Sequence, residues 1–291
     1  AIYFGTFDLE KLEEVIQLKT KNSSDRNQSN PIKLHETVSK DQYINQLNGI
    51  RENIQKGIIY EMNYCVNFIG TFEKFNPEQT YIKLFENSQA PFSAYISDGK
   101  NVILSASPER FIQKVGTRLL SQPIKGTAKR GETNELDAKI AETLKKDSKE
   151  IAENVMIVDL VRNDLSKVAT KNSVVVDELC KVYSFPTVHQ LISSISCQLR
   201  PEINYTDILQ ALFPMGSMTG APKISAIQNI HNFENFGRGI YSGSVGYFEP
   251  NGNFDFNVII RTIVADMEQK QISCGVGGAI TIKSKPEQEY D

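Results

Sequence analysis

The sequence lacks the features that mark membrane, secreted and nucleic-acid-binding proteins. Its 291 residues contain no apolar run close to the roughly 20 residues that a membrane-spanning helix needs. Lys and Arg total 32 against 35 Asp and Glu, so the net charge of −3 offers no basic surface for nucleic acid and no polybasic segment for a membrane. The amino-terminal residues have no basic stretch ahead of an apolar one, and a signal peptide is not expected.

Cysteine is also sparse. The chain has four cysteines, and they are scattered without a C-x-x-C pair: Cys65, Cys180, Cys197 and Cys274. We therefore expect buried free thiols in a reducing compartment, and a cytoplasmic location.

What is present is the composition of an ordinary globular domain, with 40% hydrophobic and 23% charged residues. Apolar spacings of three and four predict a short helix capped by Thr206 and longer helices over 40–56, 78–87 and 132–164, the last broken near Asp147. β-rich stretches predict strands over 60–72, 92–97, 101–106, 173–199, 239–249, 254–266 and 270–276. Hairpins and intervening helices indicate an α+β fold in a single domain, 1–291.

Two groups of opposite chemistry flank the hairpin predicted around Val115–Thr117. Glu109 lies in Ser-Pro-Glu-Arg-Phe and Lys125 in Pro-Ile-Lys-Gly-Thr, and pairing of the two strands would bring these arms together. Lys125 precedes a Gly-Thr step, where the backbone and a hydroxyl can contact an anion. A surface salt bridge with a solvated basic loop explains the same residues, so residue types alone leave both interpretations open.

Two glycine-rich segments offer backbone amides to an anion. Gly216–Pro222 is predicted to open a helix, with Pro222 at the first helical position, and Gly275–Ala279 to form a second nest of amides. Neither has the spacing of a Walker A or dinucleotide-binding motif. Tight turns alone would also require these glycines.

Acidic residues suggest a metal site. Glu150 and Glu153 are three residues apart and share a helix face, and Glu287 and Glu289 add acids near the end of the sequence. Magnesium prefers such hard oxygen ligands together with an anionic substrate and water. A solvated acidic helix face is the plainer alternative.

His189 and Arg261 lie in apolar, strand-like segments. A lone histidine in such a place is more often a core residue with satisfied hydrogen bonds than a catalyst. Arg261 is predicted to face inward from a long strand and needs a partner, and a bound carboxylate would form a bidentate one.

A series of motifs in a fixed order identifies a family. They are Ser-Pro-Glu-Arg-Phe, Pro-Ile-Lys-Gly-Thr, Val-Asp-Leu-Val-Arg-Asn-Asp, Gly-Ser-Met-Thr-Gly-Ala-Pro-Lys, Val-Gly-Tyr-Phe and Val-Ile-Ile-Arg-Thr. Over roughly residues 38–291 the chain resembles the chorismate-utilising enzymes, and among them those that form aminodeoxychorismate. The resemblance implies a sandwich of two large antiparallel sheets with helices outside and the site between them. It also makes residues 1–38 the remnant of a longer amino-terminal portion.

The expected reaction depends on the residue at position 125. Anthranilate synthases look similar but have Ala there, whereas the resemblance makes Lys125 a nucleophile that adds at C2 of chorismate as the C4 hydroxyl leaves. Ammonia then enters at C4 and expels the lysine, giving 4-amino-4-deoxychorismate for para-aminobenzoate and folate synthesis. An attacking amine must be partly neutral, so we expect a lowered pKa for Lys125. The leaving hydroxide needs an acid, and the resemblance gives this role to Glu109.

The resemblance assigns the remaining residues by position. His189 completes the expected catalytic group and, with Thr127, lines the ring pocket. The enolpyruvyl carboxylate is expected to meet Arg261, Tyr247 and the amides of Gly277 and Gly278. Mg²⁺ is expected on Glu150, Glu153 and Glu289, the last of which begins an E-x-x-E pair whose second member would be residue 292. Ammonia is expected from a glutamine amidotransferase subunit.

Other interpretations stay open. Isochorismate and salicylate synthases of the family activate water with a lysine on the long strand, where the aligned residue here is Glu61, so water is disfavoured as the nucleophile. Lys125 disfavours anthranilate synthase. A non-catalytic chorismate-binding subunit belongs to another class of function. The retained Glu109, Lys125 and His189 argue against it, whereas the missing residue 292 keeps it open.

Overall fold

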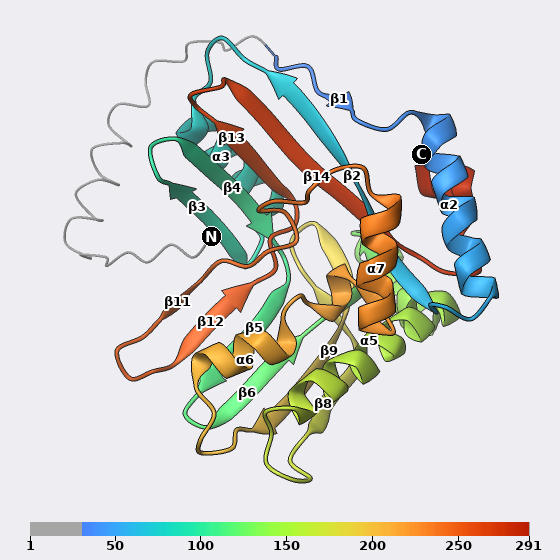
Figure 1. Ribbon diagram of the computed structural model, residues 1–291, viewed down its shortest axis with the longest axis vertical. Helices are drawn as coiled ribbons and strands as arrows, with labels where there is room; N and C mark the ends of the chain where they lie inside the picture. Colours follow the sequence, from blue (N-terminus) through green and yellow to red (C-terminus); the bar gives the residue numbers. More distant parts are fainter. Residues whose placement is uncertain (1–30, 291) are drawn as a thin grey trace.

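Two antiparallel sheets form the frame of the computed structural model, which describes residues 31–290 (Figure 1). Within these residues each sheet has seven strands. Sheet A runs β1–β2–β14–β13–β4–β3, with β10 paired to β2, and consists of β1 (His35–Glu36), β2 (Glu61–Thr71), β3 (Phe92–Ser97), β4 (Asn101–Ser107), β10 (Gly220–Ala221), β13 (Thr262–Asp266) and β14 (Gln271–Ile280). Sheet B runs β11–β12–β5–β6–β9–β7, with β8 paired to β9, and consists of β5 (Arg110–Val115), β6 (Arg118–Gln122), β7 (Ile124–Lys129), β8 (Val175–Ser184), β9 (Val188–Gln198), β11 (Gly246–Phe248) and β12 (Phe254–Asn257).

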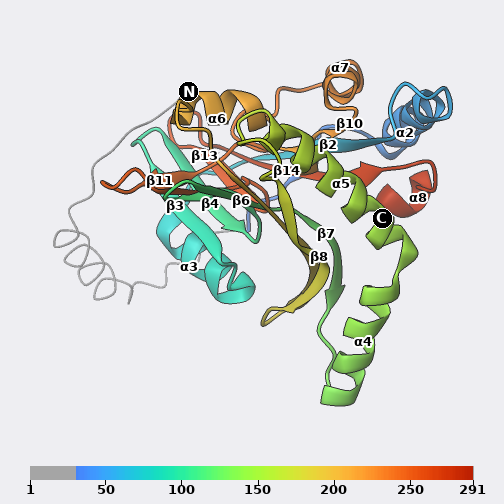
Figure 2. The same ribbon diagram turned by 90° about the horizontal axis from the view of Figure 1, so that it is seen from below.

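Helices cover the sheets. They are α2 (Lys40–Gln55), α3 (Pro77–Ser88), α4 (Asn134–Lys146), α5 (Ser148–Ser166), α6 (Tyr205–Leu212), α7 (Lys223–Phe233) and α8 (Pro286–Tyr290). The core of sheet B packs against α5 and α6, and α4 projects from the body beside β7 and β8 (Figure 2). No helix in the described part of the chain has the length and apolar character to cross a membrane.

The alternation of side chains along β2 divides sheet A into an outer and an inner face. Met62 and Tyr64 join the buried cluster under α2 and α7, and Phe72, of the same parity, belongs to the cluster under α3. Successive side chains of a strand point to opposite faces. Glu61 and Cys65 therefore face the other way, and Cys65 packs in the core shared with sheet B.

The chain passes between the two sheets at two crossings that are bonded to each other. One leads from β4 to β5 through Glu109, and the other leads from β12 to β13 through Val258 and Arg261. The Glu109 carbonyl accepts from the Val258 amide at 3.0 Å, and the Arg261 carbonyl accepts from the Ala106 amide at 3.1 Å. Glu109 and Arg261 are thereby held at the junction of the sheets.

The predicted α+β class and most of the predicted elements are confirmed. Ser39 caps α2 by accepting from the Gln42 amide, as an N-cap serine should. The break near Asp147 is also confirmed, because Asp147 ends α4 and accepts from two amides at the start of α5. The β5–β6 hairpin turns at Gly116, which has a φ of 59°. Most of the predicted remnant, 1–38, lies outside the described residues.

The strand predicted over 254–266 is wrong. It is two strands, β12 in sheet B and β13 in sheet A, because the chain changes its pairing partners from β11 and β5 to β14 and β4. Arg261 lies on the crossing between them, with a φ of 49°, and does not face inward from a long strand. The strand predicted over 239–249 is reduced to Gly246–Phe248.

The predicted nest at Gly275–Ala279 is wrong as well. These residues belong to β14, which pairs with β2 along its whole length, so their backbone follows a regular ladder. The glycines serve close packing instead. A Cβ at Gly275 would lie 2.4 Å from the Tyr241 ring, and one at Gly277 would lie 2.5 Å from Cys65 Sγ.

The segment Gly216–Pro222 does not open a helix directly. It forms a 3₁₀ turn, Gly216–Met218, and then β10, and Pro222 is the residue ahead of α7 rather than its first helical residue. The segment that begins at Gly216 lies against β2, because β10 within it pairs with the start of that strand. The predicted cap at Thr206 is also wrong, since Asn204 caps α6 and its side chain accepts from the amides of Thr206 and Asp207.

Gly220→Ala should destabilise the fold. Gly220 has a φ of 138°, and a Cβ there would lie 2.2 Å from the Glu61 carbonyl oxygen, so alanine would force β10 off β2. We expect a loss of more than about 1 kcal/mol in the free energy of unfolding, measured by urea denaturation. Gly252→Ala is the control, because Gly252 has a φ of 82° but a Cβ there would meet no atom within 4 Å. An equal loss in both variants would mean that backbone strain alone, and not the contact with Glu61, determines the effect.

Candidate active site

Lys125 forms a buried ion pair that joins the two sheets. Its Nζ, on β7 of sheet B, lies 3.1 Å from Oε1 of Glu61, at the start of β2 in sheet A. The two side chains are 10% and 1% exposed, and Glu61 Oε2 has no hydrogen-bond partner among the described residues. The inner-facing parity of Glu61 on β2 thus places its carboxylate on the lysine.

The carboxylates around Lys125 keep it charged. Burial on its own would lower the pKa of Lys125, but the nearby charges of Glu61, Glu153 and Glu109 outweigh burial, and the pKa is raised. The lowered pKa expected from the sequence is therefore wrong for this state. Lys125 can act as a nucleophile only after a neighbour takes its proton, and Glu61 is in contact with it.

Glu109 is a buried carboxyl at the junction of the sheets. Burial raises its pKa to about 7, against the opposing influence of the Ser217 hydroxyl, the Lys125 charge and the Ile124 amide. The hairpin thus brings the arms of Glu109 and Lys125 together, as expected. A carboxyl with this pKa holds a proton in much of the population near neutral pH, which is what a general acid requires.

Arg261 shares this junction with Glu109. Its guanidinium has no hydrogen bond or ion pair in the described part of the chain, burial lowers its pKa, and the Glu109 charge opposes that change. Its left-handed backbone is unusual for arginine and is fixed by the hydrogen bond from Ala106. A cationic fork without a protein partner can hold an anion.

His189 on β9 is buried, and both of its ring nitrogens are engaged. Nε2 is 2.8 Å from Asp137 Oδ1, and Nδ1 is 2.8 Å from Ser184 Oγ. The carboxylate fixes the proton on Nε2, so Nδ1 accepts from the serine hydroxyl. In this arrangement His189 has no free nitrogen for a substrate, and proton transfer through it would have to pass through Ser184.

The predicted metal ligands come together in part. A Cβ on Gly126 would lie 3.1 Å from Glu150 Oε2, so the glycine lets β7 approach that carboxylate. Lys149 Nζ lies 3.9 Å from Glu153 and 3.7 Å from Glu289, which brings α8 to the start of α5. No group of three potential ligands for one metal ion is found within residues 31–290.

Glu150 and Glu153 have the electrostatics of a cation site. Burial raises the pKa of Glu153 to about 7, and the neighbouring charge of Glu61 adds to this; burial also raises the pKa of Glu150. Glu153 Oε1 is buried and lacks a hydrogen-bond partner in the described chain. A bound cation would relieve both the repulsion and the unpaired oxygen.

The other residues expected to contact the substrate lie on different strands of the two sheets. Thr127 is exposed on β7. It is next to Ala128, which pairs with His189 on the neighbouring strand β9. Gly277 and Gly278 lie on β14 opposite Cys65 and Tyr64. Tyr247 is 55% exposed on the edge strand β11, with β12 and β5 between it and β6. The structure does not bring Tyr247 to Arg261 or Lys125.

Sequence patterns did not reveal several of the contacts that complete these groups. Tyr241 is buried against Gly275 of β14. The partners of Lys125 and His189, namely Glu61 and Asp137, are distant in sequence. Position 61 is singled out only because related synthases have a lysine there, and nothing in the sequence shows that it contacts Lys125.

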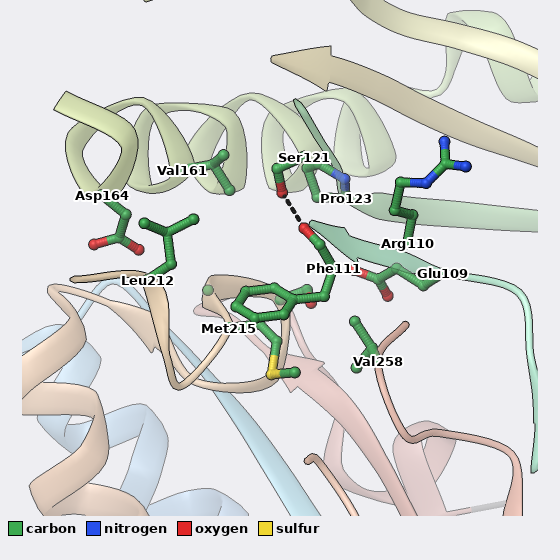
Figure 3. Close-up of a pocket in the computed structure, with 12 residues that line it drawn as sticks. Glu109, Arg110, Phe111, Ser121, Pro123, Val161, Asp164, Leu212, Met215 and Val258 are labelled. Atoms are coloured by element: carbon green, nitrogen blue, oxygen red, sulfur yellow. Dashed lines mark hydrogen bonds between the residues drawn. The ribbon is translucent and has the colours of Figure 1, made fainter. Parts of the chain in front are cut away.

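A small cavity of about 20 Å³ adjoins Glu109 (Figure 3). Asp164 and Glu109 lie at opposite ends of the group of labelled side chains, with Leu212, Phe111 and Met215 between them. Ser217 also lines the cavity. Its buried Oγ lies close enough to Glu109 to lower the pKa of that carboxyl, but it makes no hydrogen bond of normal geometry within the described residues. A second cavity of about 240 Å³ lies elsewhere, beside Tyr241 and Gly275, and neither Lys125 nor Glu109 lines it.

The family of chorismate binding enzymes matches residues 6–291. The chain belongs to this family. The match begins ahead of residue 38, where the resemblance is expected to begin, and it includes every residue of the site described above.

Several curated relatives are aminodeoxychorismate synthases, and one, from Synechocystis, is described as an anthranilate synthase component I-like protein that is 35% identical over 99% of this chain and 60% of the relative. Component 1 of the Escherichia coli enzyme is 40% identical over 253 residues, which are 87% of this chain and 55% of the relative. The chloroplastic aminodeoxychorismate synthase of Arabidopsis thaliana is 40% identical over 256 residues, 87% of this chain and 28% of the relative. The chain thus spans about half the length of the Escherichia coli relative and less of the Arabidopsis thaliana one.

Solved structures of the family share the fold across different reactions. Anthranilate synthase component I of Streptococcus pneumoniae is 26% identical, with a TM-score of 0.82 over 98% of this chain and 64% of that one. The menaquinone-specific isochorismate synthase of Escherichia coli, at 21% identity, has a TM-score of 0.78 over 96% of this chain and 65% of that one. The expected sandwich is confirmed, and the residues of the site must separate the reactions.

Glu109→Gln should change how stability depends on pH. The folded pKa of Glu109, about 7, lies above the ordinary value of 4.5, so its contribution is present below about pH 4.5 and is lost as pH rises through about 7. At about 1.4 kcal/mol for each pKa unit, the wild type should lose up to about 3 kcal/mol relative to Glu109→Gln between pH 5 and pH 8. Glu153 titrates in the same direction but is present in both proteins, so it cancels.

Urea unfolding at pH 5, 6, 7 and 8 measures this difference. Glu52→Gln is the control for the loss of one carboxylate, because Glu52 is exposed on α2. Parallel pH curves for the wild type and Glu109→Gln would contradict a raised pKa for Glu109.

Proposed function

We propose that the chain is the synthase component of an aminodeoxychorismate synthase, which converts chorismate and ammonia to 4-amino-4-deoxychorismate. The observation that carries the proposal is the buried pair of Lys125 with Glu61, in the same site as Glu109, whose pKa burial raises to about 7. The aminodeoxychorismate synthases among the relatives support the same reaction.

The residues suggest how the first half of the reaction proceeds. Glu61 takes a proton from the Lys125 ammonium, and the neutral amine adds at C2 of chorismate. The ring double bonds shift, the C4–O bond breaks, and Glu109 gives its proton to the departing hydroxyl, which leaves as water. Burial of all three groups strengthens these interactions because water does not screen them.

Anionic groups of chorismate have a receptor in the free guanidinium of Arg261. Its place on the crossing between the sheets sets it next to Glu109, so a carboxylate bound there would lie beside the reacting ring. We assign the neighbouring tyrosine role to Tyr241 rather than to Tyr247, because Tyr241 is buried against Gly275 on β14, whereas Tyr247 is 55% exposed on the edge strand β11.

Mg²⁺ is the cofactor that we propose for the acidic face of α5. Glu150 and Glu153 would hold it, with Glu289 approaching from α8, and it would supply positive charge for a carboxylate of the substrate. Burial is the main cause of the raised pKa values of Glu150 and Glu153, and repulsion from neighbouring carboxylates adds to it, so a bound cation would favour their charged forms.

Ammonia is scarce at neutral pH because ammonium predominates. We therefore propose that a glutamine amidotransferase subunit docks on the chain and supplies ammonia, as the designation "component 1" of the Escherichia coli relative suggests. A cytoplasmic location remains a prediction, and one relative is described as chloroplastic.

The product formed from chorismate tests the proposal. With Mg²⁺ and ammonium the purified chain should form aminodeoxychorismate, and with glutamine in place of ammonium it should form none. Mass and absorbance distinguish this product from anthranilate and isochorismate. Either of those as the main product, or turnover with glutamine alone, would contradict the assignment.

Lys125→Ala should abolish the covalent step. We expect aminodeoxychorismate formation to fall by at least about 10²-fold, and residual product to shift toward the C2-amino compound. Lys149→Ala, which removes an exposed lysine near the same acids, is the matched control. A lysine that only attracts carboxylates predicts a raised KM and an unchanged kcat for Lys125→Ala. Mass spectrometry should also find a chorismate adduct on the Lys125 peptide when ammonia is omitted.

Glu153→Gln should uncouple chorismate binding from Mg²⁺. In the wild type we expect chorismate to bind at least about tenfold more tightly with Mg²⁺ than with excess chelator, because the ion neutralises the α5 carboxylates. In the variant the two titrations should converge. Equal affinities with and without Mg²⁺ in the wild type would refute the metal assignment.

A further inference from the structure

The small cavity beside Glu109 has the size of a single small molecule. Its volume of about 20 Å³ exceeds the roughly 10–15 Å³ that one water-sized molecule needs. Most of its lining is apolar: Phe111, Val161, Leu212, Met215 and Val258. A neutral molecule is accepted by such walls far more readily than a cation.

Polar groups line the cavity at both ends and along one wall. On the wall, Ser121 already donates to the Phe111 carbonyl, and Arg110 is bound to Asp255. Glu109 and Ser217 form the end near the sheet junction, where the buried Ser217 Oγ makes no hydrogen bond of normal geometry within residues 31–290. Asp164 forms the other end, where Lys223 binds it and also donates to the Pro214 carbonyl at 2.7 Å. A polar molecule in the cavity would therefore find its hydrogen-bond partners beside Glu109.

We propose that this cavity is the ammonia site of the second half-reaction, in which neutral ammonia is held between Ser217 and Glu109 until it attacks C4. This inference rests on the proposed function. No residue of the cavity other than Glu109 has a role in the first half-reaction.

The chemistry balances around Glu109. After the first half-reaction Glu109 is a carboxylate and Lys125 is bound to C2 as a secondary ammonium. The ammonia lone pair forms the C4–N bond, the double bonds shift back, and the C2–N bond breaks, which releases Lys125 as a neutral amine. The new C4 ammonium gives a proton to Glu109, and Lys125 regains the proton held by Glu61. Chorismate and ammonia have become aminodeoxychorismate and water.

Val161 offers a test by size, because it lines the cavity from α5. Val161→Ile adds one methylene and should fill the cavity, raising the KM for ammonium at least about tenfold while chorismate binding is unchanged. Val161→Ala enlarges the cavity and should let methylamine act in place of ammonia. We expect the ratio of kcat/KM for methylamine to that for ammonium to rise at least about tenfold.

Val158 provides the matched controls. It is a buried valine of the same helix and the same core, but it does not line the cavity. Val158→Ile and Val158→Ala should leave the KM for ammonium and the choice of amine unchanged. Ser217→Ala provides a variant of nearly unchanged shape if Val161→Ile does not fold, and it should raise the KM for ammonium about fivefold through one lost hydrogen bond.

The outcomes separate the two proposals. A wild type that forms aminodeoxychorismate, with Val161 and Val158 variants alike in their use of ammonium and methylamine, overturns the ammonia site and leaves the proposed function intact. A wild type that forms no aminodeoxychorismate with any concentration of ammonium overturns the proposed function and this site with it.

Discussion

The contact between Lys125 and Glu61 is the constraint on which the site depends. It connects the end strand of one sheet to the inner face of the other, in surroundings where an unpaired charge would be costly. β10 lies against the start of β2 beside this pair, because Gly220 permits a backbone approach to Glu61 that a side chain would not allow. The orientation of the Lys125 side chain and the spacing of the two sheets thus depend on the same ion pair.

Two of the carboxyls around Lys125 have different surroundings. Glu61 contacts the ammonium directly, whereas Glu109 is buried at the sheet crossing, where burial outweighs the favourable charges and raises its pKa to about 7. A carboxyl with a pKa raised in this way is suited to donate a proton near neutral pH.

The family uses one fold for several reactions, so the chemistry must lie in a few side chains. Anthranilate and isochorismate synthases match the chain over nearly its whole length. In this chain a lysine on β7 faces an acid on β2, and a small cavity adjoins Glu109. The nucleophile, its proton acceptor and the space for the incoming amine would together set which product forms.

The sequence by itself determined the α+β class, most helices, the Ser39 cap and the family, because these follow from local periodicity and from motifs read in order. It also singled out Lys125 and Glu109, which one hairpin joins. Only the tertiary structure decided the charge of Lys125, since that depends on Glu61 and Glu153, which are distant in sequence. The tertiary structure also divided 254–266 between two sheets, turned the expected glycine nest into a strand, and placed Tyr241 beside Gly275. In each case the partner across the sheet, and not the local sequence, fixes the outcome.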